Sequence, residues 1–149
     1  MKKYILILIV ALTAVTAVTA SAQTHINSLV SKLEKSPSTD LTFVEKRNPS
    51  THEITSEQYV FVVPASEIKT IINAISSDRQ QSVSYSIVSS KLYRAQFKNG
   101  NVTTDVIFVS DRPSIADQAF MAGVPVMTTG ENVLVVKRTY APKSAADKK

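Results

Sequence analysis

The sequence predicts an α+β fold, with two amphipathic helices packed on one face of an antiparallel sheet of about five to six strands. Two segments carry apolar residues at the helical spacing i, i+3, i+4, i+7. Other segments alternate apolar and polar residues or are rich in β-branched and aromatic residues, as strands are. Turn-forming Asn-Pro and Asn-Gly pairs separate some of these strands. The expected order is α-β-β-α-β-β-β-(short α or loop)-β.

The N-terminus has the three parts of a secretory signal peptide. Residues 1–3 are basic, residues 4–18 are almost wholly apolar, and Ala20-Ser21-Ala22 is a small-x-small site. We expect cleavage between Ala22 and Gln23. The alternative, a transmembrane anchor, calls for a longer apolar run and no cleavage site. The protein is therefore expected to be exported, to the periplasm or the outside of a Gram-negative bacterium.

Three regions follow from this pattern: a signal peptide at residues 1–22, a single α+β domain at 23–140 and a disordered basic tail at 141–149. The chain has no cysteine, so core packing and strand pairing must stabilise the exported domain, and thiolate zinc sites are excluded. The formal charge of +5 falls to +3 without Lys2 and Lys3, and no basic stripe interleaves with aromatics. We therefore expect no nucleic-acid binding, and no later segment is apolar for long enough to cross a membrane.

The first helix is expected over residues 24–35, capped by Thr24 and ended by Ser36-Pro37. A strand follows at 41–47, with Leu41 and Phe43 facing the core. Asn48-Pro49-Ser50 forms a turn, and a longer strand covers about 53–63. The apolar face of the helix consists of Ile26, Leu29, Val30 and Leu33.

The second helix is expected to begin at the N-cap Ser66 and to reach about Arg79. Its apolar face consists of Ile68, Ile71, Ile72 and Ile75. Asn99-Gly100 predicts a type I′ hairpin between two of the later strands. Residues 114–122 form either a short helix or an ordered loop, and 124–128 a short strand. The other expected strands are 82–88, 91–97, 101–110 and 132–140.

The two helical patterns map onto each other with an offset of 42 residues, and each is followed by strands. Two explanations remain: an ancient duplication, or the general solution of laying amphipathic helices on one sheet. The residue identities barely match, and both explanations give the same architecture.

The sequence carries no catalytic motif. With only three glycines, neither G-x-x-x-x-G-K nor G-x-G-x-x-G can be written, and G-x-S-x-G and H-E-x-x-H are absent. The two histidines, His25 and His52, are far apart. We therefore expect no catalytic residues, no metal and no cofactor. Carboxylates leave no local signature, so Asp105, Asp111 and Glu131 remain candidates for convergence.

The stretch "EKRNPSTHE" (45–53) has two interpretations. It is either the polar tip of a hairpin or a basic surface of Lys46, Arg47 and His52 for an acidic partner. Outward-facing strand residues are further contact candidates: Thr55, Glu57, Tyr59, Tyr93 and Arg94. A third candidate surface is the segment 111–130 with Phe120, Met121 and Met127, whose alternative role is ordinary core.

Several pieces together resemble a Bacteroidetes family of small exported proteins of unknown function. They are the helix "INSLVSKLEKS", the "EKRNP" turn, the second helix ending near "AISSDRQQSVSY" and the hairpin "YRAQFKNG", within residues 24–110. The resemblance implies an envelope or secreted location and a small α+β fold, and it brings no catalytic residues. The segment 111–130 is longer than that pattern suggests. The repeated helix-plus-sheet units also resemble beta-lactamase-inhibitor-protein-like modules, which bind proteins across a sheet face.

We expect an exported, non-catalytic binding or interaction module of the bacterial cell envelope, whose partner is an envelope protein, a peptide or a glycan. The alternatives are a small envelope hydrolase that uses carboxylates brought together from separate strands, or a purely structural envelope protein. The oligomeric state and the sheet face that contacts the partner stay open at this stage.

Overall fold

A computed structural model describes residues 23–89, 91–110 and 132–142. The helices are α2 (Thr24–Glu34) and α3 (Ile68–Asp78), and α3 is flanked by the short 3-10 turns Ala65–Glu67 and Arg79–Gln81. The strands are β1 (Asp40–Arg47), β2 (Ile54–Val63), β3 (Ser84–Ser89), β4 (Leu92–Asn99), β5 (Val102–Val109) and β6 (Asn132–Tyr140). The predicted α+β class and element order are confirmed.

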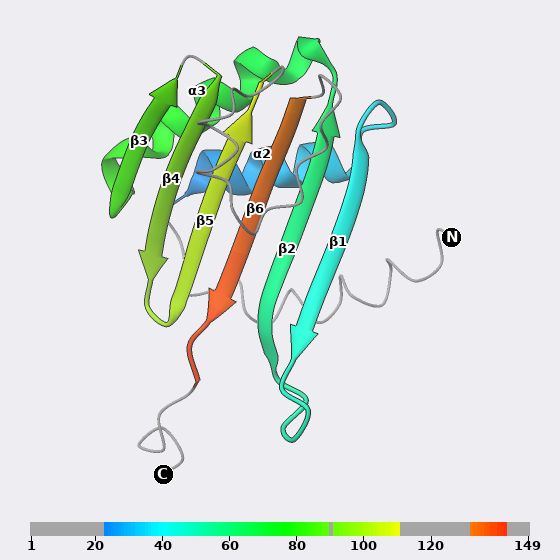
Figure 1. The fold of residues 1–149 in the computed structure, drawn as a ribbon, viewed down its shortest axis with the longest axis vertical. Coiled ribbons are helices and arrows are strands. Elements are labelled where there is room, and N and C mark those ends of the chain that lie inside the picture. The colour runs from blue at the N-terminus through cyan, green and yellow to red at the C-terminus, as the bar shows by residue number, and fades with distance from the viewer. Residues whose placement is uncertain (1–22, 90, 111–131, 143–149) are drawn as a thin grey trace.

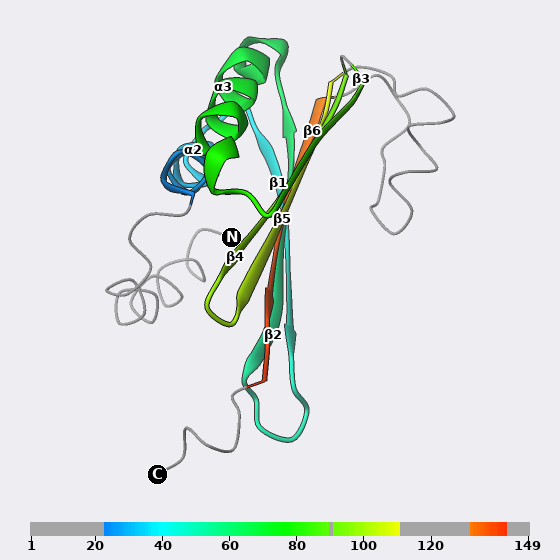
Figure 2. The same ribbon diagram turned by 90° about the vertical axis from the view of Figure 1, so that its left-hand side faces the viewer.

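The strands form one antiparallel sheet in the order β1-β2-β6-β5-β4-β3. Figures 1 and 2 show both helices on the same face of this sheet, over one end of the strands, while β1, β2 and β6 extend well past them. The order is symmetric about the β5–β6 pair, because each half contributes a helix, an edge strand and the strand beside it. This arrangement suits either explanation of the internal similarity.

The main core lies between the helices and the covered face of the sheet. Its largest fully buried side chains are three phenylalanines of the sheet, Phe61, Phe97 and Phe108. Ile26 and Leu33 of α2 and Ile71 and Ile75 of α3 pack in the same cluster. Burial of these side chains stabilises a domain that has no cysteine to form disulfides.

The apolar face of α2 is as predicted: Ile26, Leu29, Val30 and Leu33 are all buried. The face of α3 continues one turn further than predicted, since Ile71, Ala74, Ile75 and Asp78 are its buried residues. Ile68 and Ile72 are only partly buried. The fourth buried position of α3 is thus occupied by a carboxylate.

The predicted N-caps are wrong, because neither Thr24 nor Ser66 caps its helix. Thr24 is the first residue of α2, and the next backbone N–H groups of that helix reach the Asp78 carboxylate of α3 instead. Ser66 lies inside the 3-10 turn that leads into α3, where backbone hydrogen bonding replaces a side-chain cap.

The β4–β5 hairpin has Gly100 and Asn101 as its loop residues, with Asn99 paired to Val102. Only Gly100 has a positive φ, of 58°. A type I′ turn needs a positive φ at both loop residues, so the predicted turn type is wrong although the hairpin is present. Glycine at the first loop position provides the left-handed backbone instead.

The short helix or ordered loop predicted at 114–122, the strand predicted at 124–128, and Asp111 and Glu131 lie outside the described residues, as do the predicted signal peptide and most of the predicted tail. Within the described ranges, neither helix has the length and apolar character needed to cross a membrane.

Candidate functional site

The hairpin loop 48–53 between β1 and β2 is held by its own polar groups. The Asn48 side-chain oxygen accepts hydrogen bonds from the backbone of Ser50 (2.8 Å) and Thr51 (3.2 Å). Asn48 also exchanges backbone hydrogen bonds with this loop, donating to Glu53 (2.8 Å) and accepting from His52 (2.8 Å). His52 has a positive φ of 58°. These bonds are those of an asparagine-initiated turn.

The three basic residues of this hairpin differ in their contacts. Arg47 lies 2.5 Å from the Glu45 carboxylate and donates to the His52 carbonyl at 3.0 Å. Lys46 and His52 are exposed, and neither side chain has an ion pair within the part of the chain that the structure describes. Arg47 therefore braces the hairpin, and Lys46 projects from the sheet.

The other predicted contact residues do not share one face. Tyr59 is 6% exposed and belongs to the main core, where its ring lies 4.8 Å from that of Phe43. Tyr93 also packs against this core. Both tyrosines, like the buried Glu57, face the helix side, so their predicted outward orientation is wrong. Arg94 lies on the opposite face, because successive residues of a strand point to opposite sides.

The face without helices divides into a polar half and an apolar half. Residues paired across the strands form rows, and the two rows furthest from the helix-covered end are hydrophilic except for Val44. We call their hydrophilic residues the polar patch. They are Lys46, Ser56, Thr139, Thr103 and Lys98 in one row, and Gln58, Lys137, Asp105, Gln96 and Ser84 in the next.

Charge in the polar patch is mainly positive. Lys46, Lys98 and Lys137 are exposed on three different strands. Asp105 accepts a hydrogen bond from Gln96 at 2.8 Å and lies 3.8 Å from Arg94 of the neighbouring row. Six paired strands hold these groups in place, so the patch presents lysines, hydroxyls and amides on a rigid surface.

The apolar half of the same face is already buried. Val60, Val133 and Val135 form one small cluster, and Leu92 and Val109 another, each less than a tenth exposed. This half therefore offers little surface to a partner, whereas the polar patch does.

A charged cluster lies on the helix side of the sheet. Its row of paired residues comes between the two rows of the polar patch, on the opposite face. Glu45 and Glu57 are directly opposite each other on β1 and β2, and Arg138 is next to Glu57 on β6. Glu57 is 3% exposed, accepts a hydrogen bond from the Tyr140 hydroxyl (2.7 Å) and lies 3.9 Å from Arg138. Like charges opposite each other destabilise a sheet, so these contacts are needed to hold the buried carboxylate.

This cluster shifts the ionisation of its neighbours. Burial, and then the Glu57 charge, raise the pKa of Tyr59 to about 12. Burial and the hydrogen bond to Glu57 raise the pKa of Tyr140 well above its usual range. Burial raises the pKa of Glu34 at the end of α2, against the lowering effect of Arg138. The neutral forms of these groups are therefore favoured in the folded protein.

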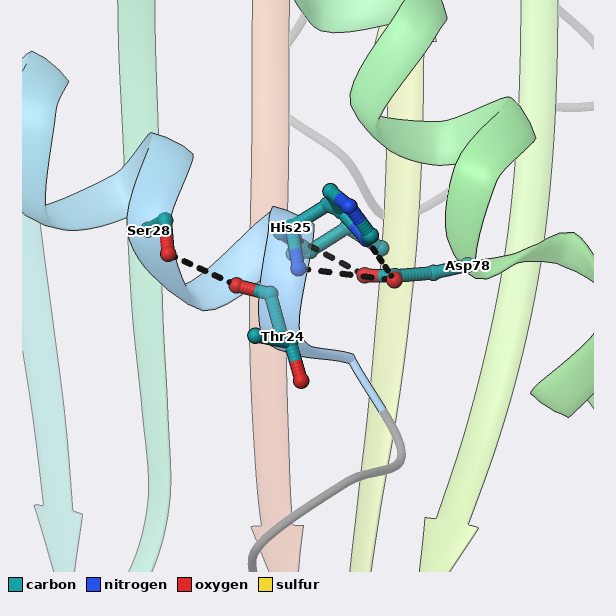
Figure 3. Close-up of polar contacts among 5 residues, drawn as sticks. Thr24, His25, Ser28 and Asp78 are labelled. Carbon is teal, nitrogen blue, oxygen red and sulfur yellow. Dashed lines mark hydrogen bonds and ion pairs between the residues drawn. The ribbon is translucent and has the colours of Figure 1, made fainter.

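Asp78 joins the two helices. Figure 3 shows its carboxylate turned toward the first turn of α2. Its oxygens accept from the backbone of His25 (3.4 Å) and Ile26 (2.9 Å), and one lies 2.7 Å from the His25 ring nitrogen Nδ1. Ser28 donates to the Thr24 carbonyl at 2.8 Å. Asp78 is 1% exposed, so this is a structural contact that anchors α2.

The predicted cleavage site is described only in part. Ala22 lies outside the described residues. Gln23 is buried, and its side-chain amide donates to the Thr104 hydroxyl of β5 at 3.2 Å. Within the described ranges, no group of three or more histidine, aspartate and glutamate side chains is placed to hold a metal ion.

No protein-family model matches the chain, and neither a curated protein nor a solved structure does. Function is therefore inferred from the chemistry of the polar patch and the charged cluster. The sequence patterns did not single out Asp78, Arg138 or Tyr140, and they placed Glu57 on the wrong face. Asp78 had a signal, because it continues the i, i+3, i+4 spacing of an otherwise apolar helix face.

Proposed function

We propose that the protein is an exported, non-catalytic binding module of the bacterial cell envelope. Its contact surface is the polar patch, and its partner is an envelope protein, peptide or glycan that carries anionic groups. The observation that carries the proposal is the placement of three exposed lysines, Lys46, Lys98 and Lys137, around hydroxyl and amide side chains on one rigid sheet face.

The chemistry of the polar patch suits carboxylate or phosphate groups spaced along a partner. Lysine ammonium groups donate to such anions, and the intervening threonine and glutamine side chains donate to and accept from hydroxyls and amides. Neighbouring strands are separated by about 4.8 Å, so Lys46 and Lys98, four strand steps apart, bracket roughly 19 Å of surface. A partner that spans this width contacts several strands together.

The expected cleavage is compatible with the described fold. Helix α2 begins at Thr24, one residue after Gln23, which is the first residue expected to remain after cleavage. Removal of residues 1–22 therefore leaves every described helix and strand complete.

The test is a crosslinked affinity purification of the tagged protein from its native envelope, followed by mass spectrometry of proteins and glycans. We expect a specific partner whose recovery falls about tenfold in the Lys98→Glu, Lys137→Glu double variant and falls with added salt, since exposed charges are screened. The matched control is Lys69→Glu on the exposed side of α3. Equal recovery by the double variant and the wild type would contradict the proposal.

The placement of Glu45 and Glu57 on neighbouring strands favours a second candidate, a small envelope hydrolase. Two carboxylates in different environments can serve as acid and base: Arg47 pairs with Glu45, whereas Glu57 is buried against Tyr140. Assays with chromogenic glycosides and peptides would decide between the two candidates. Turnover that is lost in both Glu45→Gln and Glu57→Gln, while partner recovery is unchanged, would favour the hydrolase.

A further inference from the structure

The exposed large apolar side chains of the described residues gather at the two edges of the sheet. Leu41, Phe43 and Val44 on β1 are 40%, 36% and 43% exposed. Val83 and Ile87, at the opposite edge with β3, are 60% and 55% exposed. Leu41 and Phe43 lie on the helix side of the sheet but are exposed and do not belong to the main core, so the prediction that they face the core is wrong.

Strand β1 is an edge with little protection. Among the described residues it pairs only with β2, so its outer backbone groups are available to another strand. Natural edge strands are usually blocked by proline, by charge or by a bulge. β1 contains no proline, its charged residues lie at its ends and leave Leu41 to Val44 uncharged, and its irregularity comes only between Lys46 and Arg47, which leaves Asp40 to Lys46 regular.

The charges of this regular segment are complementary to those of a second copy. Glu45 is already paired with Arg47 on the helix side, whereas Asp40 and Lys46 are the two ends of the segment and lie on the face opposite the helices. Because Phe43 is the middle residue, an antiparallel pair of two copies centred on Phe43 places Asp40 of each copy opposite Lys46 of the other. Phe43 then lies opposite Phe43 of the second copy, Thr42 opposite Val44, and Leu41 opposite Glu45, whose carboxylate stays paired with Arg47 of its own copy.

We propose that the protein forms a two-fold symmetric dimer by antiparallel pairing of β1 with β1 of a second copy, centred on Phe43. The two sheets join into one continuous sheet, with the helices of both copies on the same side. The pairing covers the exposed Leu41, Phe43 and Val44 and forms two Asp40–Lys46 ion pairs. It extends the function proposed above: it takes Lys46 of the polar patch into the dimer contact and leaves Lys98 and Lys137, on β4 and β6, for the envelope partner.

Other pairings lack this complementarity. Centring on Thr42 places Asp40 opposite Val44, and centring on Val44 places Lys46 opposite Thr42, so neither forms the ion pairs. Strand β3 has a register irregularity between Ile87 and Ser89, and Ser84–Ser89 contains no charged residue to specify a register.

The first test is sedimentation equilibrium of the exported protein. We expect a dimer, with a dissociation constant that rises about tenfold or more in Asp40→Lys and in Lys46→Asp, because each places like charges opposite each other. The double variant Asp40→Lys, Lys46→Asp restores opposite charges and is expected to recover dimerisation. A wild type that stays monomeric at high concentration, or a double variant weaker than both single variants, would overturn the proposal.

The absence of cysteine allows a second, independent test. Opposed residues of an antiparallel pair have Cα atoms about 4.5–5.5 Å apart, within the range that a disulfide spans. Phe43→Cys is therefore expected to give a disulfide-linked dimer on mild oxidation with copper phenanthroline. The matched control Ile87→Cys, on the other edge, is expected to stay largely monomeric. Efficient crosslinking of the control but not of Phe43→Cys would assign the interface to β3 and reject the β1 pairing. Neither test uses the envelope partner, so failure of the binding proposal leaves both results readable.

Discussion

The two faces of the sheet use neighbouring residues of the same strands for opposite purposes. On the helix side, Glu45, Glu57 and Arg138 form one row in which the charges are close and Glu57 is buried. One residue further along β1, on the other face, Lys46 begins a row that ends at Lys98, and both lysines are exposed.

The contrast between the buried charges of the helix side and the exposed lysines of the other face shows that charge alone does not identify a contact surface in this protein. A buried charge is stabilised by its neighbours and contributes to the fold, whereas an exposed lysine costs the fold little and is available to a partner. Substitutions on the helix side are therefore expected to change stability, and those in the polar patch to change binding.

The largest effect is expected in the core of the helix side. Phe108→Ala removes a fully buried ring and should lower the free energy of unfolding by about 3–5 kcal/mol. Ile107→Ala, one residue away on the other face and only partly buried, should cost about 1 kcal/mol. Urea denaturation measures both. Equal losses would mean that the two faces contribute equally to the core.

The next largest effect concerns Asp78. Asp78→Ala leaves the backbone N–H of Ile26 without its partner and should cost roughly 2–3 kcal/mol. Asp105→Ala in the polar patch should cost about 0.5 kcal/mol, since its contacts with Gln96 and Arg94 are partly exposed. Thermal and urea unfolding compare the two variants. A larger loss for Asp105 would reverse the roles assigned to the faces.

The raised pKa of Tyr59 makes the stability of the helix side depend on pH. An unfolded tyrosine ionises near pH 10, whereas the pKa of Tyr59 in the folded protein is about 12. Between these values the unfolded chain binds fewer protons than the folded one, so stability is retained below pH 10 and falls as pH rises toward 12.

Tyr59→Phe should reduce the loss in the free energy of unfolding between about pH 10 and pH 12 by roughly 2 kcal/mol. Urea denaturation at several pH values from 9 to 12 measures it, and tyrosinate absorbance follows the ionisation directly. An identical pH dependence in the variant would show that Tyr59 ionises normally.

The smallest stability effect is expected in the polar patch. Lys137→Ala should change the free energy of unfolding by no more than about 0.5 kcal/mol, because its side chain is exposed. The same variant should weaken recovery of the envelope partner, with urea denaturation and crosslinked purification as the two measurements. A large loss of stability with unchanged recovery would place Lys137 in the fold rather than in the contact surface.

Local patterns were sufficient for most of the elements. The final strand has the predicted bounds, Asn132–Tyr140, because its β-branched run is flanked by clear turn residues. The four buried residues of α2 followed from helical spacing. The N-caps were not predictable in this way, since the first turn of α2 is bonded by Asp78, more than fifty residues away in the chain.

The candidate surface was predicted only in part. Lys46 projects from the sheet, but Tyr59 faces the core, since a shift of one residue along a strand reverses every side chain. Lys98 and Lys137 did not stand out, because nothing local indicated that β4 and β6 share an open face with Lys46.

The sequence by itself determined the class of the fold and the positions of the described helices and most of the described strands, because hydrophobic periodicity and turn chemistry act over a few residues. The tertiary structure alone decided three features: β6 lies between β2 and β5, Glu57 and Arg138 are neighbours on the helix side of the sheet, and β1 is an edge strand. These features depend on strand order and register, which arise from contacts between residues far apart in the chain.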